Sequence, residues 1–262
     1  MKIIRFERDG DVGHLVLANP PYNRVNTEFA VRLREAVHEA SASAIRVLLL
    51  RAEGPNFSLG GEVREWPGKD EHWFRTFVAE VNASYRALEA LRIPTVAAVQ
   101  GAAFGGGYEL ALACDLILAA DTAVFRCVEV TTAMLPLAGA VQRLAERIGR
   151  ARAARLVMLG EAISGSEAAA LGIIAQVVPA EDLARASAEV ARHLSTGPTR
   201  AYAATRALLK AWSSGGLAAA DVLMLDLTMD LFRSEDAVRG FANTAQAFDA
   251  EVEPPAMTFA GR

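Results

Sequence analysis

Short apolar runs alternate with amphipathic helical segments over the first 120 residues, and this alternation constrains the fold more than any other feature. The runs Val47–Leu50, Thr95–Val99 and Leu116–Ala120 are too short for buried helices and predict buried strands. Between the first two, residues 71–91 carry apolar side chains at helical spacing. Strands that alternate with helices favour an α/β fold with right-handed crossovers.

The remaining segments extend this pattern toward both ends of the chain. Residues 3–8 and 12–17 predict a β-hairpin, and Asn26 or Thr27 is expected to cap the helix that follows. Glycines predict loops over 53–61 and 101–107. Beyond residue 139 the pattern is helical, apart from a strand expected within 172–178. The predicted helices there are 139–148, 150–159, 166–171, 181–194, 198–212, 217–232 and 235–249. We therefore divide the chain into an α/β core, 1–195, and a C-terminal helical region, 196–262.

Composition excludes several classes of protein. The 262 residues include 27 basic and 31 acidic side chains, a net charge of −4, which argues against a nucleic-acid binder that acts by neutralising phosphates. No stretch suits a signal peptide or a membrane span, so we expect no membrane partner. The two cysteines, Cys114 and Cys127, cannot form a disulfide framework. The economical expectation is a reducing, cytoplasmic location.

The segment from Val96 to Asp115 combines a buried strand, a glycine-rich turn and the start of a helix. Four of the seven residues from Gly101 to Gly107 are glycine. Glycine lets a ligand approach the backbone, and the first N–H groups of a helix are unpaired and can stabilise an oxyanion. Glu109 lies just inside the expected helix, where its carboxylate can act as an acid or a base. A triple glycine alone is more often a packing turn, and the segment matches neither a dinucleotide-binding fingerprint nor a phosphate-binding loop.

The same segment, from Val96 to Leu116, resembles the signature of the crotonase superfamily, the enoyl-CoA hydratase/isomerase family. Residues 56–63, Asn-Phe-Ser-Leu-Gly-Gly-Glu-Val, are similar to a second loop of that family. Residues 125–144 resemble a third block, with matches that include Glu129 and Pro136. The resemblance continues through 149–151, 159–161, 168–178 and 235–241, so it covers nearly the whole chain.

This resemblance implies a crotonase-like spiral of ββα units with a C-terminal helical trimerisation region, assembled as a homotrimer or homohexamer. It implies an oxyanion hole made by the N–H groups of Gly61 and Gly106, and two catalytic glutamates, Glu109 and Glu129. The substrate would be an acyl-CoA thioester, so coenzyme A enters as part of the substrate, and neither a further cofactor nor a metal is expected. The implied substrate-binding residues are Asn23, Arg24, Leu59, Gly60, Glu62, Val63, Gly105 and Leu137.

Several residues depart from the family pattern. Ala133, Leu137 and Ala140 stand where the family usually has glycine, and their side chains should narrow or reshape the acyl pocket. Glu62 replaces an aspartate. Residues 249–253 are acidic where a Lys-Arg pair is common, which leaves Arg24, Arg206 and Lys210 as candidates for contacts with the phosphates of coenzyme A.

The function that this pattern favours is hydration of a 2-enoyl-CoA by a hydro-lyase. An enoyl-CoA isomerase, a thioester hydrolase or decarboxylase of the same fold, and a non-catalytic assembly subunit remain open. The sequence leaves the acyl group and the pathway undecided. The four histidines lack the spacing of metal ligands, and Cys127 has no neighbouring histidine in sequence and reads as a buried structural thiol.

Overall fold

The computed structural model describes residues 2–261, which form two compact units. The first extends to Leu91 and includes Thr95–Ala191, and the second contains Arg92–Pro94 and the residues from Arg192 onward. The first unit is an α/β structure and the second is helical, so the predicted α/β class with a C-terminal helical region is confirmed.

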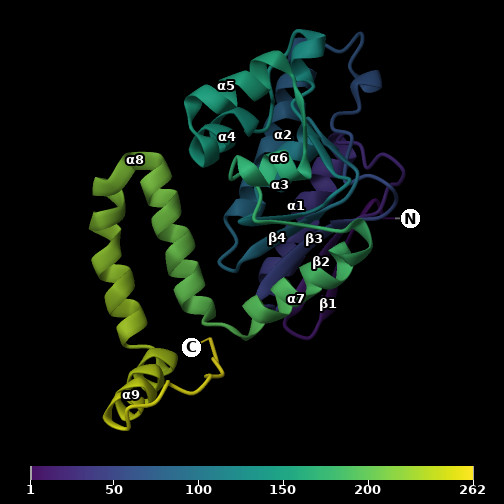
Figure 1. The fold of residues 1–262 in the computed structure, drawn as a ribbon. Helices are drawn as coiled ribbons and strands as arrows, with labels where there is room; N and C mark the ends of the chain where they lie inside the picture. Colours follow the sequence, from purple (N-terminus) through teal and green to yellow (C-terminus); the bar gives the residue numbers. More distant parts are fainter. Residues whose placement is uncertain (1, 262) are drawn as a thin grey trace. The chain divides into compact units, whose positions relative to one another are not determined.

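A six-stranded sheet forms the core of the first unit, with the strand order β1-β2-β3-β4-β6-β9. Strands β1 to β4 are labelled side by side in Figure 1. Strands β1 and β2 form the predicted antiparallel hairpin, and every later pair in this sheet is parallel. The three apolar runs at 47–50, 95–99 and 116–120 are indeed strands and lie in the sheet interior. The strands of this sheet are β1 (Ile4–Asp9), β2 (Val12–Leu17), β3 (Val47–Ala52), β4 (Thr95–Val99), β6 (Leu116–Ala120) and β9 (Gln176–Val178).

The prediction of a loop over 101–107 is partly wrong, because residues 102–104 form a strand of a second, three-stranded sheet. It contains β5 (Ala102–Phe104), β7 (Val124–Arg126) and β8 (Ala162–Ser164) in the order β5-β7-β8. Three-residue strands are too short to produce a periodic pattern, and the glycines that flank β5 made the segment resemble a loop. This sheet matters for function because it places Gly105 directly after a hydrogen-bonded strand.

Helices of the first unit begin close to where their capping residues predict. Asn26 is the cap of α1 (Thr27–Ala42), and its Oδ1 accepts from the N–H of Phe29 at 2.9 Å. Asp70 caps α2 (Glu71–Glu89) in the same way, through the N–H of Trp73 at 2.7 Å. The other α-helices that begin in this unit are α3 (Gly106–Leu112), α4 (Ala140–Ile148), α5 (Arg150–Leu159), α6 (Gly165–Ala170) and α7 (Leu183–Thr196). Short 3₁₀ turns, η1 (Val63–Glu65), η2 (Glu129–Thr132) and η3 (Ala180–Asp182), complete it.

Two helices, α8 (Thr199–Phe232) and α9 (Glu235–Asp249), dominate the second unit. The backbone at Gly216 is not helical, with φ 70° and ψ −168°, so α8 is interrupted between the two helices predicted there. Glycine adopts this positive φ without the clash that a Cβ would cause. None of the helices in the described part of the chain is long and apolar enough to cross a membrane.

Candidate active site

The first unit contains a cavity of about 200 Å³ whose lining includes exposed rim residues and deeply buried ones. The rim residues include Val63 and Met134, whose exposed fractions are 44% and 37%. The buried lining residues include Phe77 and Val81, which are each only 4% exposed. The cavity is lined by Arg24, Val25, Leu59, Gly61, Val63, Trp66, Phe77, Val81, Gly105, Gly106, Glu109, Val128, Glu129, Thr131, Thr132, Met134, Leu137 and Ala138.

Two glycine segments meet at the wall of this cavity. Gly60 has φ +76°, and a Cβ built on it would lie 2.6 Å from the carbonyl oxygen of Phe104 and 3.2 Å from the nitrogen of Gly106. Only glycine permits such an approach. Hydrogen bonds fix the register of the two segments, because the N–H of Phe104 donates to the carbonyl of Ser58 at 2.9 Å.

This close packing leaves two backbone donors at the cavity wall. Gly61 and Gly106 both line the cavity. Within the described residues, neither of their N–H groups donates a hydrogen bond. Unpaired N–H groups that face a partly desolvated cavity are suited to bind a polarised oxygen. The arrangement therefore fits the pair of donors that the resemblance implied.

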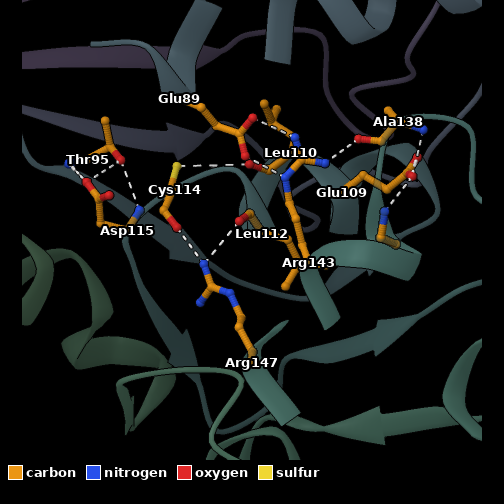
Figure 2. Close-up of polar contacts among 11 residues, drawn as sticks. Glu89, Thr95, Glu109, Leu110, Leu112, Cys114, Asp115, Ala138, Arg143 and Arg147 are labelled. Atoms are coloured by element: carbon orange, nitrogen blue, oxygen red, sulfur yellow. Dashed lines mark hydrogen bonds and ion pairs between the residues drawn. The ribbon is translucent and has the colours of Figure 1, made fainter. Parts of the chain in front are cut away.

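Glu109 is almost completely buried, with an exposed fraction of 2%. One of its carboxylate oxygens, Oε1, accepts from the N–H groups of Ala138 at 2.7 Å and Ala140 at 3.0 Å; Figure 2 shows the carboxylate beside Ala138. Burial raises the pKa of Glu109, and these N–H donors and the positive charge of Arg143 partly oppose that rise. A buried carboxylate with one oxygen fixed is well oriented for proton transfer.

Glu129 begins η2 and faces the same cavity. Its Oε2 atom is buried and has no hydrogen-bond partner in the part of the chain that the structure describes. Burial, followed by repulsion from the charge of Glu109, raises the pKa of Glu129 to about 7. A Cβ on Gly105 would lie 2.8 Å from Oε1 of Glu129, so the missing side chain at Gly105 makes room for this carboxylate. The two glutamates are thus electrostatically coupled in one cavity.

Polar contacts from α2 and α4 hold the walls in place. The hydroxyl of Tyr85 donates to the carbonyl of Gly106 at 2.7 Å. The amide of Asn82 donates to the carbonyl of Leu137 at 2.6 Å. Arg143 forms two hydrogen bonds with the carboxylate of Glu89, at 2.6 and 2.8 Å, and a third with the carbonyl of Ala138 (Figure 2). These contacts fix the backbone whose N–H groups bind Glu109.

Of the eight implied substrate-binding residues, five line the cavity and three do not. The five are Arg24, Leu59, Val63, Gly105 and Leu137. Asn23 is buried, and its amide donates to the carbonyls of Glu53 and Asn56, so its side chain braces the loop behind the cavity. Gly60 contributes the close backbone approach described above, and Glu62 binds Arg64 through both carboxylate oxygens.

Half of the lining residues were not predicted to belong to the site, among them three that lie on α2 or directly follow η1. Trp66, Phe77 and Val81 line the cavity, but the spacing of Phe77 and Val81 identified them only as part of the apolar face of a helix. No pattern in the sequence showed that this face would border a cavity rather than solid core. Across residues 2–261, no three His, Cys, Asp or Glu side chains gather in an arrangement that could hold a metal.

Comparisons with known proteins agree with this geometry. The family model for enoyl-CoA hydratase/isomerase matches residues 7–251. The chain is 36% identical, over 75% of its length and 78% of the relative's, to a protein named probable enoyl-CoA hydratase of Mycobacterium bovis. It is 31% identical to a probable enoyl-CoA hydratase of Rhodobacter capsulatus, over 97% of both chains. The crystal structure of an enoyl-CoA hydratase from Bacillus anthracis superimposes with a TM-score of 0.88 at 26% identity, covering 99% of this chain and 100% of that one. The chain therefore belongs to the enoyl-CoA hydratase/isomerase family and has the crotonase fold.

Proposed function

We propose that this protein is a 2-enoyl-CoA hydratase, which adds water across the C2–C3 double bond of an acyl-CoA thioester to give a 3-hydroxyacyl-CoA. The observation that carries the proposal is the presence of the buried Glu109, the half-buried Glu129 and two unpaired glycine N–H groups, in the described residues, around one cavity. The relatives named probable enoyl-CoA hydratase support the same activity.

In this proposal the N–H groups of Gly61 and Gly106 bind the carbonyl oxygen of the thioester. When water attacks C3, the electrons of the double bond move toward C2 and the carbonyl, and the oxygen becomes enolate-like. Two donors aimed at that oxygen stabilise the charge where it develops. Because they are backbone groups held by close glycine packing, they need little reorganisation during the reaction.

The two glutamates then move the protons. Two N–H donors hold the carboxylate of Glu109 and offset part of the rise that burial causes in its pKa. In its ionised form Glu109 accepts the proton that water loses as the O–C3 bond forms. With its pKa near 7, Glu129 is protonated in a large fraction of molecules at neutral pH, and it supplies the proton that forms the C2–H bond. The sum is the addition of one water, and proton exchange between the carboxyl groups or with solvent restores the starting state.

Glutamine substitutions test these roles. Glu109→Gln and Glu129→Gln should each lower kcat by about 10²–10⁴-fold, whereas binding of a saturated, non-reactive acyl-CoA should change far less, since the glycine N–H groups remain. The losses should be strongly non-additive in the double variant, because the two groups work on one water. The assay is the loss of enoyl-thioester absorbance, and calorimetry gives the binding constant. If Glu129→Gln retains turnover within a few-fold of the parent, the two-carboxylate hydratase is wrong.

An enoyl-CoA isomerase is the second candidate, because shifting a double bond needs only one group that moves a proton. The partnerless Oε2 of Glu129 supports it, since that oxygen can reach a substrate carbon without first breaking a hydrogen bond. Assay of Glu109→Gln with a 3-enoyl-CoA separates the two: full isomerisation by this variant would assign the chemistry to Glu129 alone. Failure of the wild type to bind any acyl-CoA at millimolar concentration would contradict both enzymes and favour a non-catalytic subunit.

A further inference from the structure

We infer that Trp66 closes the acyl pocket and restricts the enzyme to short or compact acyl groups. The inference rests on the proposed function and deepens it, because it names the class of enoyl-CoA that the cavity accepts and the residue that sets the limit. It comes from the volume and lining of the cavity and from a cluster of four aromatic rings, two of which line it.

The position of Trp66 relative to the reacting carbonyl is the first step. A Cβ built on Gly61 would lie 3.0 Å from Cζ2 and 3.4 Å from Cη2 of the indole. The benzene edge of Trp66 therefore lies directly against the backbone whose N–H group is proposed to bind the thioester oxygen. Acyl carbons that follow that carbonyl into the cavity must pass along this ring.

The indole is held in place by neighbouring rings. The ring centroid of Trp66 lies 5.3 Å from that of Phe74, in an edge-to-face arrangement, and 5.9 Å from that of Phe77. On its other side Phe77 stacks nearly parallel to Trp73, at 5.6 Å and 4°. Aromatic pairs in these geometries contribute attraction beyond the area that they bury. The contacts with Phe74 and Phe77 thus hold the indole of Trp66 in place, and we expect a longer acyl chain not to displace it.

Other lining residues also limit the space for an acyl chain. Phe77 and Val81 close it on the side of α2. Leu137 also borders the cavity, and its carbonyl is tied to Asn82 of the same helix. The cavity volume of about 200 Å³ is smaller than the roughly 300–1,000 Å³ typical of pockets for drug-sized ligands. We therefore expect the cavity to take a short acyl group together with the attacking water, rather than a long straight chain.

Binding of saturated acyl-CoAs of increasing length tests the limit directly. The probes are butanoyl-, hexanoyl-, octanoyl- and decanoyl-CoA, measured by calorimetry, with the corresponding 2-enoyl-CoAs for turnover. Each buried methylene group should strengthen binding about fourfold, the equivalent of ~0.8 kcal/mol. In the wild type this gain should stop by hexanoyl-CoA, and kcat/KM should fall for longer substrates. Trp66→Ala should extend the gain by at least one pair of methylene groups, and Trp66→Phe should give a smaller extension.

Trp73→Ala is the matched control, because it removes an indole of the same cluster that does not line the cavity, and its length profile should follow the wild type. Thermal unfolding checks that each variant is folded. The inference is overturned if affinity in the wild type keeps rising about fourfold per methylene group to decanoyl-CoA. A wild-type profile in folded Trp66→Ala also overturns it. A length limit in binding with no turnover of any enoyl-CoA would instead support the pocket and contradict the hydratase. Binding of no acyl-CoA would overturn both.

Discussion

The raised pKa of Glu129 makes the free energy of unfolding depend on pH. Its pKa is about 7 in the folded protein against an ordinary value of 4.5. Between these values the folded state holds a proton that the unfolded chain has released. The free energy of unfolding is therefore greatest below pH 4.5 as far as this group is concerned, falls as the pH rises toward 7, and is constant above that.

Glu129→Gln should remove this part of the pH dependence. Because one pKa unit corresponds to about 1.4 kcal/mol, the variant should gain on the order of 1–3 kcal/mol of stability relative to the wild type between pH 5 and pH 8. Urea unfolding at the two pH values measures the difference. Glu109, whose pKa is also raised, contributes in the same direction, so the variant should keep a residual slope. Parallel curves for variant and wild type would show that Glu129 titrates normally.

The backbone conformation at Ala133 favours glycine, the residue that the resemblance led us to expect there. The structure places Ala133 in the left-handed region, with φ 57° and ψ 28°, where it ends η2. A Cβ there costs roughly 1–2 kcal/mol, and glycine avoids most of that cost at the expense of a larger loss of chain entropy. Ala133→Gly should therefore stabilise the protein by about 0.5–1 kcal/mol.

Thermal or urea unfolding checks the effect of Ala133→Gly, with Ala154→Gly as its control. Ala154 lies inside α5, where glycine should destabilise by about 1 kcal/mol. Two changes of the same chemistry with opposite signs would identify the backbone conformation as the cause. Destabilisation at both positions would contradict the strain at Ala133.

The two glutamates of the candidate site could be predicted from the sequence, whereas Trp66 could not. Resemblance singled out Glu109 and Glu129, and the structure brings both to one cavity with Gly61 and Gly106. Trp66 gave no comparable signal, because its role depends on which faces of η1 and α2 meet the glycine backbone. That arrangement is tertiary, and the local sequence does not contain it.

Helices α2 and α4 are joined at the site by an ion pair between Glu89 and Arg143. The side chains of Arg143 and Glu89 are 13% and 32% exposed, so the pair is only partly screened by water. Arg143 also donates to the carbonyl of Ala138, whose N–H group binds Glu109. The guanidinium of Arg143 thus connects α2 and α4 to the backbone segment that positions Glu109.

A double-mutant cycle with Arg143→Gln and Glu89→Gln should give a coupling energy of about 1–2 kcal/mol in unfolding experiments. Each single change removes one side of this partly buried ion pair, so the double variant should be more stable than the sum of the singles predicts. Arg32→Gln with Glu35→Gln, an exposed ion pair on α1, is the control and should couple by less than about 0.5 kcal/mol. Equal coupling in both cycles would mean that Arg143 holds α2 no more firmly than a surface pair does.

Elements with strong local signals were predictable and the others were not. The interior strands β3, β4 and β6 are continuous apolar runs, and α2 has both a cap and a regular apolar face, so each appears where the sequence predicts it. Strand β5 has only three residues and depends on partners from 124–126. Its existence is decided by pairing across the chain, and local propensity therefore predicted a loop.

At the scale of the whole molecule, the second unit exposes many large apolar side chains on α8 and α9. Val222 is 81% exposed, and the other large apolar side chains that α8 and α9 expose include Leu209, Trp212, Leu217, Met224, Leu225, Met229, Phe232, Val238, Phe241 and Phe248. Extended apolar patches of this kind mark surfaces that pack against other protein. Family resemblance implies trimers or hexamers, and we expect this unit to supply part of the contact between subunits.

Substitution at Val222 tests that expectation. Burying a valine side chain in an interface contributes about 1.5–3 kcal/mol, and an aspartate there would in addition require a carboxylate to lose water. Val222→Asp should therefore weaken assembly by at least about tenfold in dissociation constant, seen as a shift toward monomer in sedimentation velocity at micromolar concentration. Asp221→Asn, which removes a charge from the adjacent exposed residue, should sediment like the wild type. A wild-type chain that sediments as a stable monomer would contradict the assembly altogether, whereas an intact oligomer of folded Val222→Asp would place the contact on another face.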